Sequence, residues 1–179
     1  MHNLVRQPTK VIQRKTATRS LSAFFLLLLN CQFFSLTAVA QNQPNDNPPI
    51  FENPTISPGF TPDPLTVKGI GGGKIPANEI AGTLGTSNGS CVGFVDKEPD
   101  HILTLNNFFD YLSLRVRSNS DTTLVIKGPG GVWCNDNYDG SDKNAGIAGQ
   151  WLAGTYQIWV GSYSKDTYPA YIIELSQKK

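Results

Sequence analysis

The sequence predicts an all-β protein built as an antiparallel β-sandwich, and three observations carry this prediction. Short apolar and β-branched segments recur from residue 101 onward, Gly, Pro, Asn and Asp residues separate them, and no stretch after residue 40 shows helical periodicity over ten or more residues. Five to eight short strands with such spacing are typical of a sandwich. A chain of 179 residues, only 16% of them charged, has room for one such domain and its appendages.

Residues 1–40 have the parts of a signal peptide. Five basic residues and no acidic one precede residue 20, the apolar segment Leu21–Leu29 follows, and Ala38 and Ala40 supply the small pair that precedes a cleavage site. We expect cleavage after Ala40. An uncleaved anchor over residues 21–40 is the alternative, since 20 residues could cross a bilayer, but Asn30 and Gln32 would then lie near its middle.

The charge of the chain is unevenly distributed. The formal net charge is +1, but all acidic residues lie after residue 45, so the chain after residue 40 has a net charge of −4. Nucleic-acid binding depends on basic clusters that neutralise phosphates, and Arg115 and Arg117 are the only arginines left. We therefore expect no nucleic-acid partner, and membrane contact only through an uncleaved signal peptide.

A linker and a neck are predicted between the signal peptide and the strands. Residues 41–65 contain seven prolines, which fix φ and remove backbone donors, so this Pro/Asn-rich stretch is expected to be a disordered linker. Residues 66–89 form a Gly-rich neck with one or two strands, around Leu65–Val67 and Glu79–Leu84. The folded domain is expected over residues 90–179.

The strands of the domain are predicted from alternation and from turn residues. In Phe109–Val116, Leu112 and Leu114 point to one face while Ser113 and Arg115 point to the other, which indicates a half-buried strand. The other predicted strands, each bounded by turn residues, are His101–Leu105, Thr122–Lys127, Val132–Cys134, Gly154–Gly161 and Tyr168–Ser176.

Cys91 and Cys134 remain after the predicted cleavage. An even pair in an exported chain indicates a disulfide. This disulfide would close the loop from residue 91 to residue 134 and would contribute roughly 4 kcal/mol of stability in the chain-entropy model. A zinc site is the weaker interpretation, because two cysteines and His101 do not have recognised ligand spacing.

The residues do not support a phosphate-binding loop or a nucleophilic catalytic site. The run Lys68–Lys74 is glycine-rich, but Ile75 follows Lys74 where a phosphate-binding loop needs Ser or Thr. Nucleophilic catalysis needs a base held near a Ser or Cys, and His101 is the only histidine after residue 40. We expect no catalytic residues, although a carboxylate pair that meets only in space would escape a search by sequence.

The polar loop after Cys134 is the candidate metal site. Its oxygen-bearing side chains are spaced like the first half of an EF-hand loop, but Gly146 stands where the bidentate acid would be, so an EF-hand is excluded. Two interpretations stay open: a Ca²⁺ site in a sandwich loop, or Asx side chains that shape a turn. The candidate ligands are Asn135, Asp136, Asn137, Asp139 and Asp142.

Aromatic residues are concentrated after residue 130. All three tryptophans lie there, and exposed rings of this kind stack on sugars, whereas buried ones build a core. We expect Trp133 and Trp159, which lie in apolar strands, to pack inside. Tyr138 and Tyr163 lie in predicted loops and are the candidates for stacking against a ligand.

Three segments together resemble the bacterial pre-peptidase C-terminal (PPC) domain: Asp121–Asn137, Ala153–Tyr163 and Tyr171–Leu175. The resemblance covers about residues 90–176. That family's pattern is a Ser-x-x-Asp-Thr strand, a Gly-Pro-x-Gly turn, an aspartate-rich loop and a Gly-x-Tyr strand. The matching positions here are Ser118–Thr122, Gly128–Gly131, Asn135–Asp142 and Gly154–Tyr156.

The resemblance implies a jelly-roll-like sandwich without catalytic activity that in some relatives binds calcium and supports secretion or adhesion. Asn135 and Asn137 replace acids that are frequent in relatives, which lowers the ligand charge for Ca²⁺. We expect a secreted, periplasmic or cell-surface protein that binds an exported protein or an extracellular polymer. A carbohydrate-binding module and a small secreted hydrolase are the alternatives.

Overall fold

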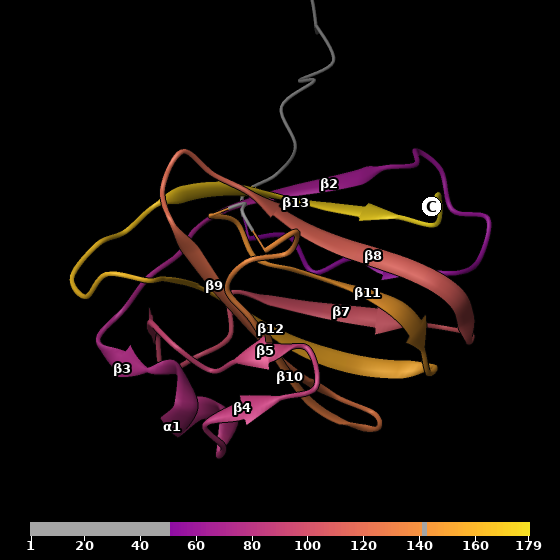
Figure 1. Ribbon diagram of the computed structural model, residues 1–179. Helices are drawn as coiled ribbons and strands as arrows, with labels where there is room; N and C mark the ends of the chain where they lie inside the picture. The colour runs from indigo at the N-terminus through magenta and orange to yellow at the C-terminus, as the bar shows by residue number, and fades with distance from the viewer. Residues whose placement is uncertain (1–50, 141–142) are drawn as a thin grey trace, which may run out of the picture. The chain divides into compact units, whose positions relative to one another are not determined.

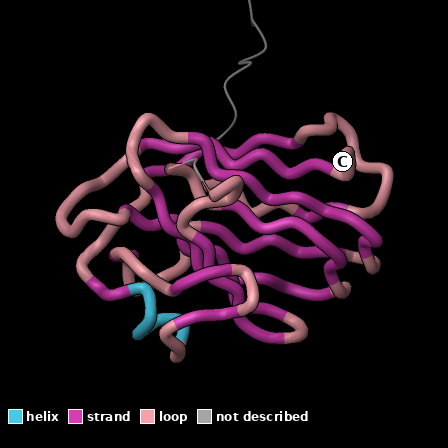
Figure 2. The backbone as a smooth tube through the Cα atoms, in the orientation of Figure 1, coloured by secondary structure: helices cyan, strands magenta, loops and turns pink. Residues whose placement is uncertain are grey.

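The computed structural model describes residues 51–140 and 143–179, so the predicted signal peptide, residues 41–50 of the predicted linker, and Asp142 lie outside the described residues. The described chain is a β-sandwich of two stacked sheets with one short helix (Figures 1 and 2). The antiparallel sandwich predicted from the sequence is confirmed.

The four-stranded sheet is entirely antiparallel, and it lies at the top of the view in Figure 1. In spatial order its strands are β11 (Gly146–Trp151), β8 (Phe109–Arg117), β13 (Ala170–Ser176) and β2 (Leu65–Ile70).

The seven-stranded sheet is centred on β12, which pairs with β7 and β6 along one side and with β9 along the other. β1 adds to β7 in parallel, and β10 pairs with the far side of β9. The strands are β1 (Thr55–Ile56), β7 (His101–Leu105), β12 (Gly154–Ser162), β9 (Thr122–Gly128), β10 (Gly131–Asn135), β6 (Phe94–Val95) and β3 (Ile75–Pro76).

Eight longer strands build the two sheets, and the chain crosses to the other sheet after each of them except β9, which is followed by its sheet neighbour β10. If these strands are numbered 1 to 8 along the chain from β2 to β13, the four-stranded sheet has the spatial order 6-3-8-1. The seven-stranded sheet contains the order 2-7-4-5. Two Greek keys folded over each other in this way are typical of a jelly roll. As a consequence, β10 and β11, which follow each other in the chain, are edge strands of opposite sheets.

The main core fills the space between the sheets. The apolar face predicted in β8 is confirmed, because Leu112, Leu114 and Val116 are buried there. On the other face Arg117 is exposed, whereas Ser113 is buried and its hydroxyl donates to the Ser176 carbonyl. The facing strands contribute apolar side chains that are fully buried, among them Leu103, Leu105, Leu124, Ile126, Ile158 and Val160.

A second, smaller core lies on the outer face of the seven-stranded sheet. The helix α1 (Ala77–Ala81) covers Val125 and Trp159 there, with Ala77 and Ala81, four residues apart, facing the sheet. Gly82 ends the helix in the left-handed conformation at φ 74°, and its N–H donates to the Asn78 carbonyl. Next to the helix lies the hairpin of β4 (Gly85–Thr86) and β5 (Gly89–Ser90), beside β10 (Figure 1).

The predicted linker and neck differ from the structure within the described residues. β1 lies inside the predicted linker, the Pro54 carbonyl accepts from Thr104 N at 2.9 Å, and Ile56 is only 5% exposed. Prolines lack a donor but keep their carbonyl acceptors, so a Pro-rich segment can still join a sheet edge. The folded domain therefore includes residues 51–89 and does not begin near residue 90.

The two strands predicted in the neck have different outcomes. Leu65–Val67 is the first half of β2 and belongs to the four-stranded sheet. Glu79–Leu84 contains the end of α1 and a turn instead of a strand, because the buried alanines are spaced for one helical turn. β11 was not predicted at all, because its two glycines and Gln150 interrupt the alternation of apolar and polar residues.

Candidate functional site

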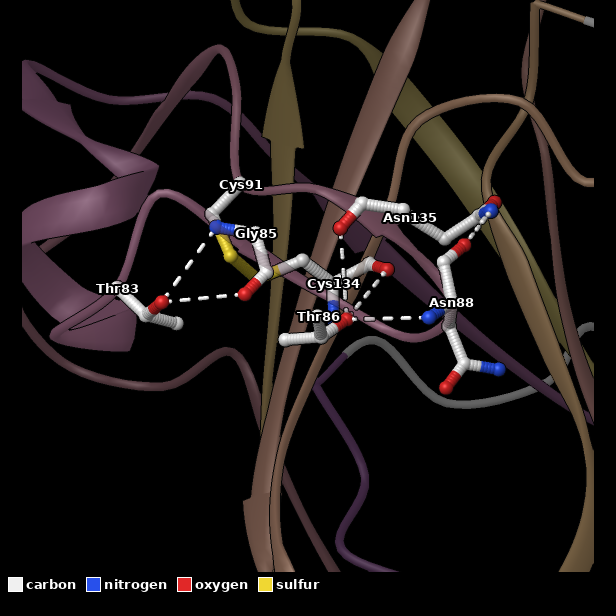
Figure 3. Close-up of a disulfide and its surroundings, with 8 residues drawn as sticks. Thr83, Gly85, Thr86, Asn88, Cys91, Cys134 and Asn135 are labelled. Carbon is white, nitrogen blue, oxygen red and sulfur yellow. Dashed lines mark hydrogen bonds between the residues drawn. A yellow bond between two sulfur atoms is a disulfide. The ribbon is translucent and has the colours of Figure 1, made fainter.

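The predicted disulfide between Cys91 and Cys134 is present. Both half-cystines are buried in the smaller core, where they join the segment after the hairpin to β10. Thr86 reinforces the junction, since its Oγ1 accepts from Cys134 N at 3.0 Å (Figure 3). The disulfide therefore holds the β4–β5 hairpin against the edge of the seven-stranded sheet.

Asn135, the first predicted calcium ligand, uses both ends of its side-chain amide within the fold. Its Oδ1 accepts from Gly146 N at 2.9 Å, and its Nδ2 donates to the Asn88 carbonyl at 2.9 Å. The side chain is 8% exposed. Asn135 thus ties together β10, the start of β11 and the β4–β5 hairpin.

The other predicted ligands in the described part of the loop make contacts of their own. Asn137 Nδ2 donates to Asp136 Oδ2 at 3.0 Å. The pKa of Arg115 is raised, mainly by a side-chain hydrogen bond with Tyr138 and to a smaller extent by the charge of Asp139. Among the described residues, no three His, Cys, Asp or Glu side chains are grouped so as to hold a metal ion. Asp142, one of the five predicted ligands, lies outside the described residues, and calcium binding by this loop stays a prediction.

The two tyrosines predicted to stack on a ligand have different environments. Tyr138 is half-buried, and the Arg115 guanidinium lies 4.1 Å from the centre of its ring. Tyr163 is 52% exposed in the loop after β12. The structure does not bring these two rings together into one site.

Asp100 and His101 lie where β7 begins, and His101 is buried. Its Nδ1 donates to the Glu52 carbonyl at 2.8 Å, so its Nε2 accepts the hydrogen of Tyr171 OH at 2.8 Å. Burial lowers the pKa of His101 below its ordinary value, while the Glu52 carbonyl opposes the shift. Both ring nitrogens are engaged, and this cluster joins the segment before β1 to the core.

Asp100 accepts from Val160 N at 2.7 Å. Burial is the main reason why the pKa of this carboxyl rises to about 7; the bond from Val160 opposes the rise, and the charge of Asp96 adds to it. Burial also raises the pKa of the Tyr171 hydroxyl far above its usual value.

An aromatic cleft opens where the edge strands β10 and β11 face each other. Its volume is about 210 Å³, and its lining includes Asn88, Trp133, Gln150, Trp151, Leu152 and Tyr156. Trp133 comes from β10, Trp151 from the end of β11, and Tyr156 from β12. Asn88 is supplied by the turn of the β4–β5 hairpin that the disulfide holds; Figure 3 shows its amide end pointing away from Thr86 and Cys134.

The three rings of the aromatic cleft pack closely. The Trp133 and Trp151 rings are stacked with centroids 6.4 Å apart, and Tyr156 meets Trp151 edge-on at 5.0 Å. Trp151 Nε1 donates to the Leu112 carbonyl, and the Tyr156 hydroxyl donates to the Leu152 carbonyl, each at 2.9 Å. These two bonds fix the inner rings, and the half-buried Trp133 lies toward the outside of the group.

The shape of β11 keeps the aromatic cleft open. Its pairing with β8 shifts register between Gly149 and Trp151, and such bulges re-aim side chains. Gly149 has φ +155°, and a Cβ built there would meet no atom within 4 Å. The exposed Gln150 side chain stands beside this open space.

The sequence predictions missed this cleft in part. Trp159 is 4% exposed and packs inside as expected, whereas Trp133 is half-buried and contributes to a surface cleft. The crowding of aromatics after residue 130 was the available signal. It could not identify the cleft because the meeting of β10 with β11 depends on the order of strands in two sheets.

Within the residues that the structure describes, no helix is both long and apolar enough to cross a membrane.

Comparisons with known proteins give a limited context. No protein-family model matches the chain. An uncharacterised protein from Synechococcus elongatus is 28% identical over 120 residues, which cover 63% of this chain and 87% of that protein. The crystal structure of the pre-peptidase C-terminal domain of a collagenase from Bacillus anthracis is similar at 13% identity and a TM-score of 0.39, over 74% of this chain and all of that domain. At this TM-score the likeness alone does not establish a shared fold.

Proposed function

We propose that this chain is an exported, non-catalytic binding domain of the PPC kind, and that it binds an extracellular polymer or an exported protein. The observation that carries the proposal is the aromatic cleft between the edges of the two sheets. It combines concave shape, aromatic rings and a few uncharged polar side chains, which are the usual features of a ligand site.

The energetic argument rests on Trp133. A half-buried indole that is braced on its inner side by Trp151 can bury further apolar surface on binding without first being ordered. Tryptophan is among the residues that contribute most binding energy when they become desolvated. Leu152, which is 51% exposed, adds apolar surface beside it.

A non-catalytic role is supported by the chemistry of the described residues. No Asp, Glu, His, Lys or Arg lines the aromatic cleft, and the hydroxyl of Tyr156, the one titratable side chain in its lining, donates to the Leu152 carbonyl. His101, the obvious candidate base, is 1% exposed and has both ring nitrogens engaged within the core.

Export is supported by the signal-peptide pattern of residues 1–40 and by the disulfide. Intact-mass analysis of the chain expressed in a bacterial host tests this part. The expected product begins at Gln41 and is lighter than its reduced form by two hydrogen atoms. A product retained in the cytoplasm with an intact N-terminus would refute export.

Co-sedimentation with insoluble polymers tests binding. The chain, the variant Trp133→Ala and the control Tyr163→Ala are each mixed with cellulose, chitin or fibrillar collagen, and the bound fraction is measured. We expect at least one polymer to retain the chain and the Tyr163→Ala control, and to lose most of the Trp133→Ala variant. Retention that does not change with Trp133→Ala, or no retention by any polymer, would contradict polymer binding in the aromatic cleft.

A further inference from the structure

We infer that the aromatic cleft takes a neutral pyranose ring of a polysaccharide. This inference rests on the proposed binding function and names the chemical class of the ligand. Three properties of the cleft support it: an apolar platform, uncharged hydrogen-bonding groups, and room for a single ring.

The apolar platform is formed by Trp133 with Leu152 beside it. Trp133 is half-buried, and its inner side is supported by Trp151 at a centroid distance of 6.4 Å. The C–H groups on one face of a pyranose are apolar and can lie on an indole ring, whose π face is electron-rich. A rigid, supported indole pays little conformational entropy when such a ring docks.

The polar groups around the platform carry no charge. The side chains of Asn88 and Gln150 line the aromatic cleft and are exposed, and amides both donate and accept, as sugar hydroxyls do. The absence of Lys, Arg and His from the lining disfavours an acidic sugar or a phosphate, because no cation would offset its desolvation.

The size of the aromatic cleft indicates one ring. Its volume of about 210 Å³ lies below the 300–1,000 Å³ that is usual for drug-sized ligands. A proline or aromatic side chain of a peptide would also fill this volume. It would leave the exposed Gln150 amide without a partner after this amide loses water, which is costly. A ring that carries hydroxyl groups can stack on the Trp133 platform and also form hydrogen bonds with the side-chain amides.

Titration with soluble oligosaccharides tests the inference. The probes are neutral gluco-oligosaccharide hexamers with β-1,4, α-1,4 or β-1,3 linkages, a chitin hexamer and an acidic galacturonate hexamer, followed by calorimetry and tryptophan fluorescence. We expect at least one neutral probe to bind more tightly than the acidic one. Trp133→Ala should weaken that binding by about tenfold or more, and Gln150→Ala by roughly threefold to tenfold.

Two variants keep the test decisive. Gln150 is exposed, so its substitution does not depend on repacking of the core, and Tyr163→Ala is a matched control for an exposed ring elsewhere. No binding of any neutral probe, or equal binding by Trp133→Ala and the unmodified chain, would overturn the inference. If collagen alone retains the chain, and Trp133→Ala abolishes this retention, the proposed binding function stands while the sugar assignment is wrong.

Discussion

Asn135 illustrates at the scale of single residues what a sequence pattern can and cannot distinguish. Its spacing from Asn137 and Asp139 is that of oxygen ligands, but its amide joins Gly146 to Asn88. An Asx side chain offers the same oxygen to a metal ion or to a backbone amide, so the pattern was open between the two. In the structure the oxygen of this side chain accepts from Gly146 N, and the Ca²⁺ site stays a prediction.

Asp100 gives a pH-dependent prediction. Its folded-state pKa of about 7 lies above the ordinary value of 3.8, so the folded state binds the proton more tightly than the unfolded state does. The stability that the proton contributes is complete below about pH 3.8 and is lost as the pH rises through 7. The variant Asp100→Asn can still accept from Val160 N but carries no charge.

We therefore expect Asp100→Asn to gain stability relative to the unmodified chain as the pH rises from 4 to 8. Urea unfolding at several pH values measures the difference. The lowered pKa of His101 has the opposite effect, because the folded state loses stability as the pH falls through 6.5 and below. His101 is present in both proteins, so its effect cancels when their stabilities are compared. Two parallel curves would show that the Asp100 carboxyl is not perturbed by the fold.

At the scale of elements, β1 shows why the start of the domain was misplaced. Proline content predicted a disordered linker over residues 41–65, whereas Thr55 and Ile56 pair with Thr104 and Leu105 of β7. A parallel strand of two residues has no alternation to detect, and its partner lies almost fifty residues away. Only tertiary contacts could reveal it.

Ile56 tests this correction. The side chain is 5% exposed within the main core, so Ile56→Ala should lower the free energy of unfolding by about 2–4 kcal/mol. The neighbouring Thr55 is exposed, and Thr55→Ala should cost less than about 1 kcal/mol. Chemical denaturation measures both. If Ile56→Ala lowered the free energy of unfolding as little as the Thr55→Ala control does, the original prediction of a disordered linker would be supported instead.

The β4–β5 hairpin connects the disulfide with the aromatic cleft. Cys91→Ala combined with Cys134→Ala should lower the free energy of unfolding by about 2–4 kcal/mol, because the unfolded chain gains freedom. It should also weaken ligand binding, since the hairpin carries Asn88 to the rim of the cleft.

Thermal unfolding and ligand titration of the double variant measure these two effects. The unmodified chain under reducing conditions is the control. Full ligand affinity in a double variant that is folded but less stable would show that the hairpin does not shape the cleft.

At the scale of the whole molecule, most strands of the sandwich could be predicted and the ligand site could not. β7, β8, β9, β10, β12 and β13 follow from alternation, β-branched residues and turns that are local in the chain. The aromatic cleft requires β10 and β11 to be edge strands of opposite sheets, which is a property of the strand order. Tyr138 and Tyr163 were chosen because they lie in loops, whereas the cleft uses rings from the strands themselves.

The central claim is that the aromatic cleft between β10 and β11 is the binding surface. Hydroxyl-radical footprinting, with and without a saturating polymer that retains the chain, tests it most directly. We predict that binding protects Trp133 and Leu152 and leaves Tyr163 and Tyr168, which are 52% and 51% exposed, as reactive as before. Protection of Tyr163 and Tyr168 with unchanged reactivity at Trp133 would contradict the claim.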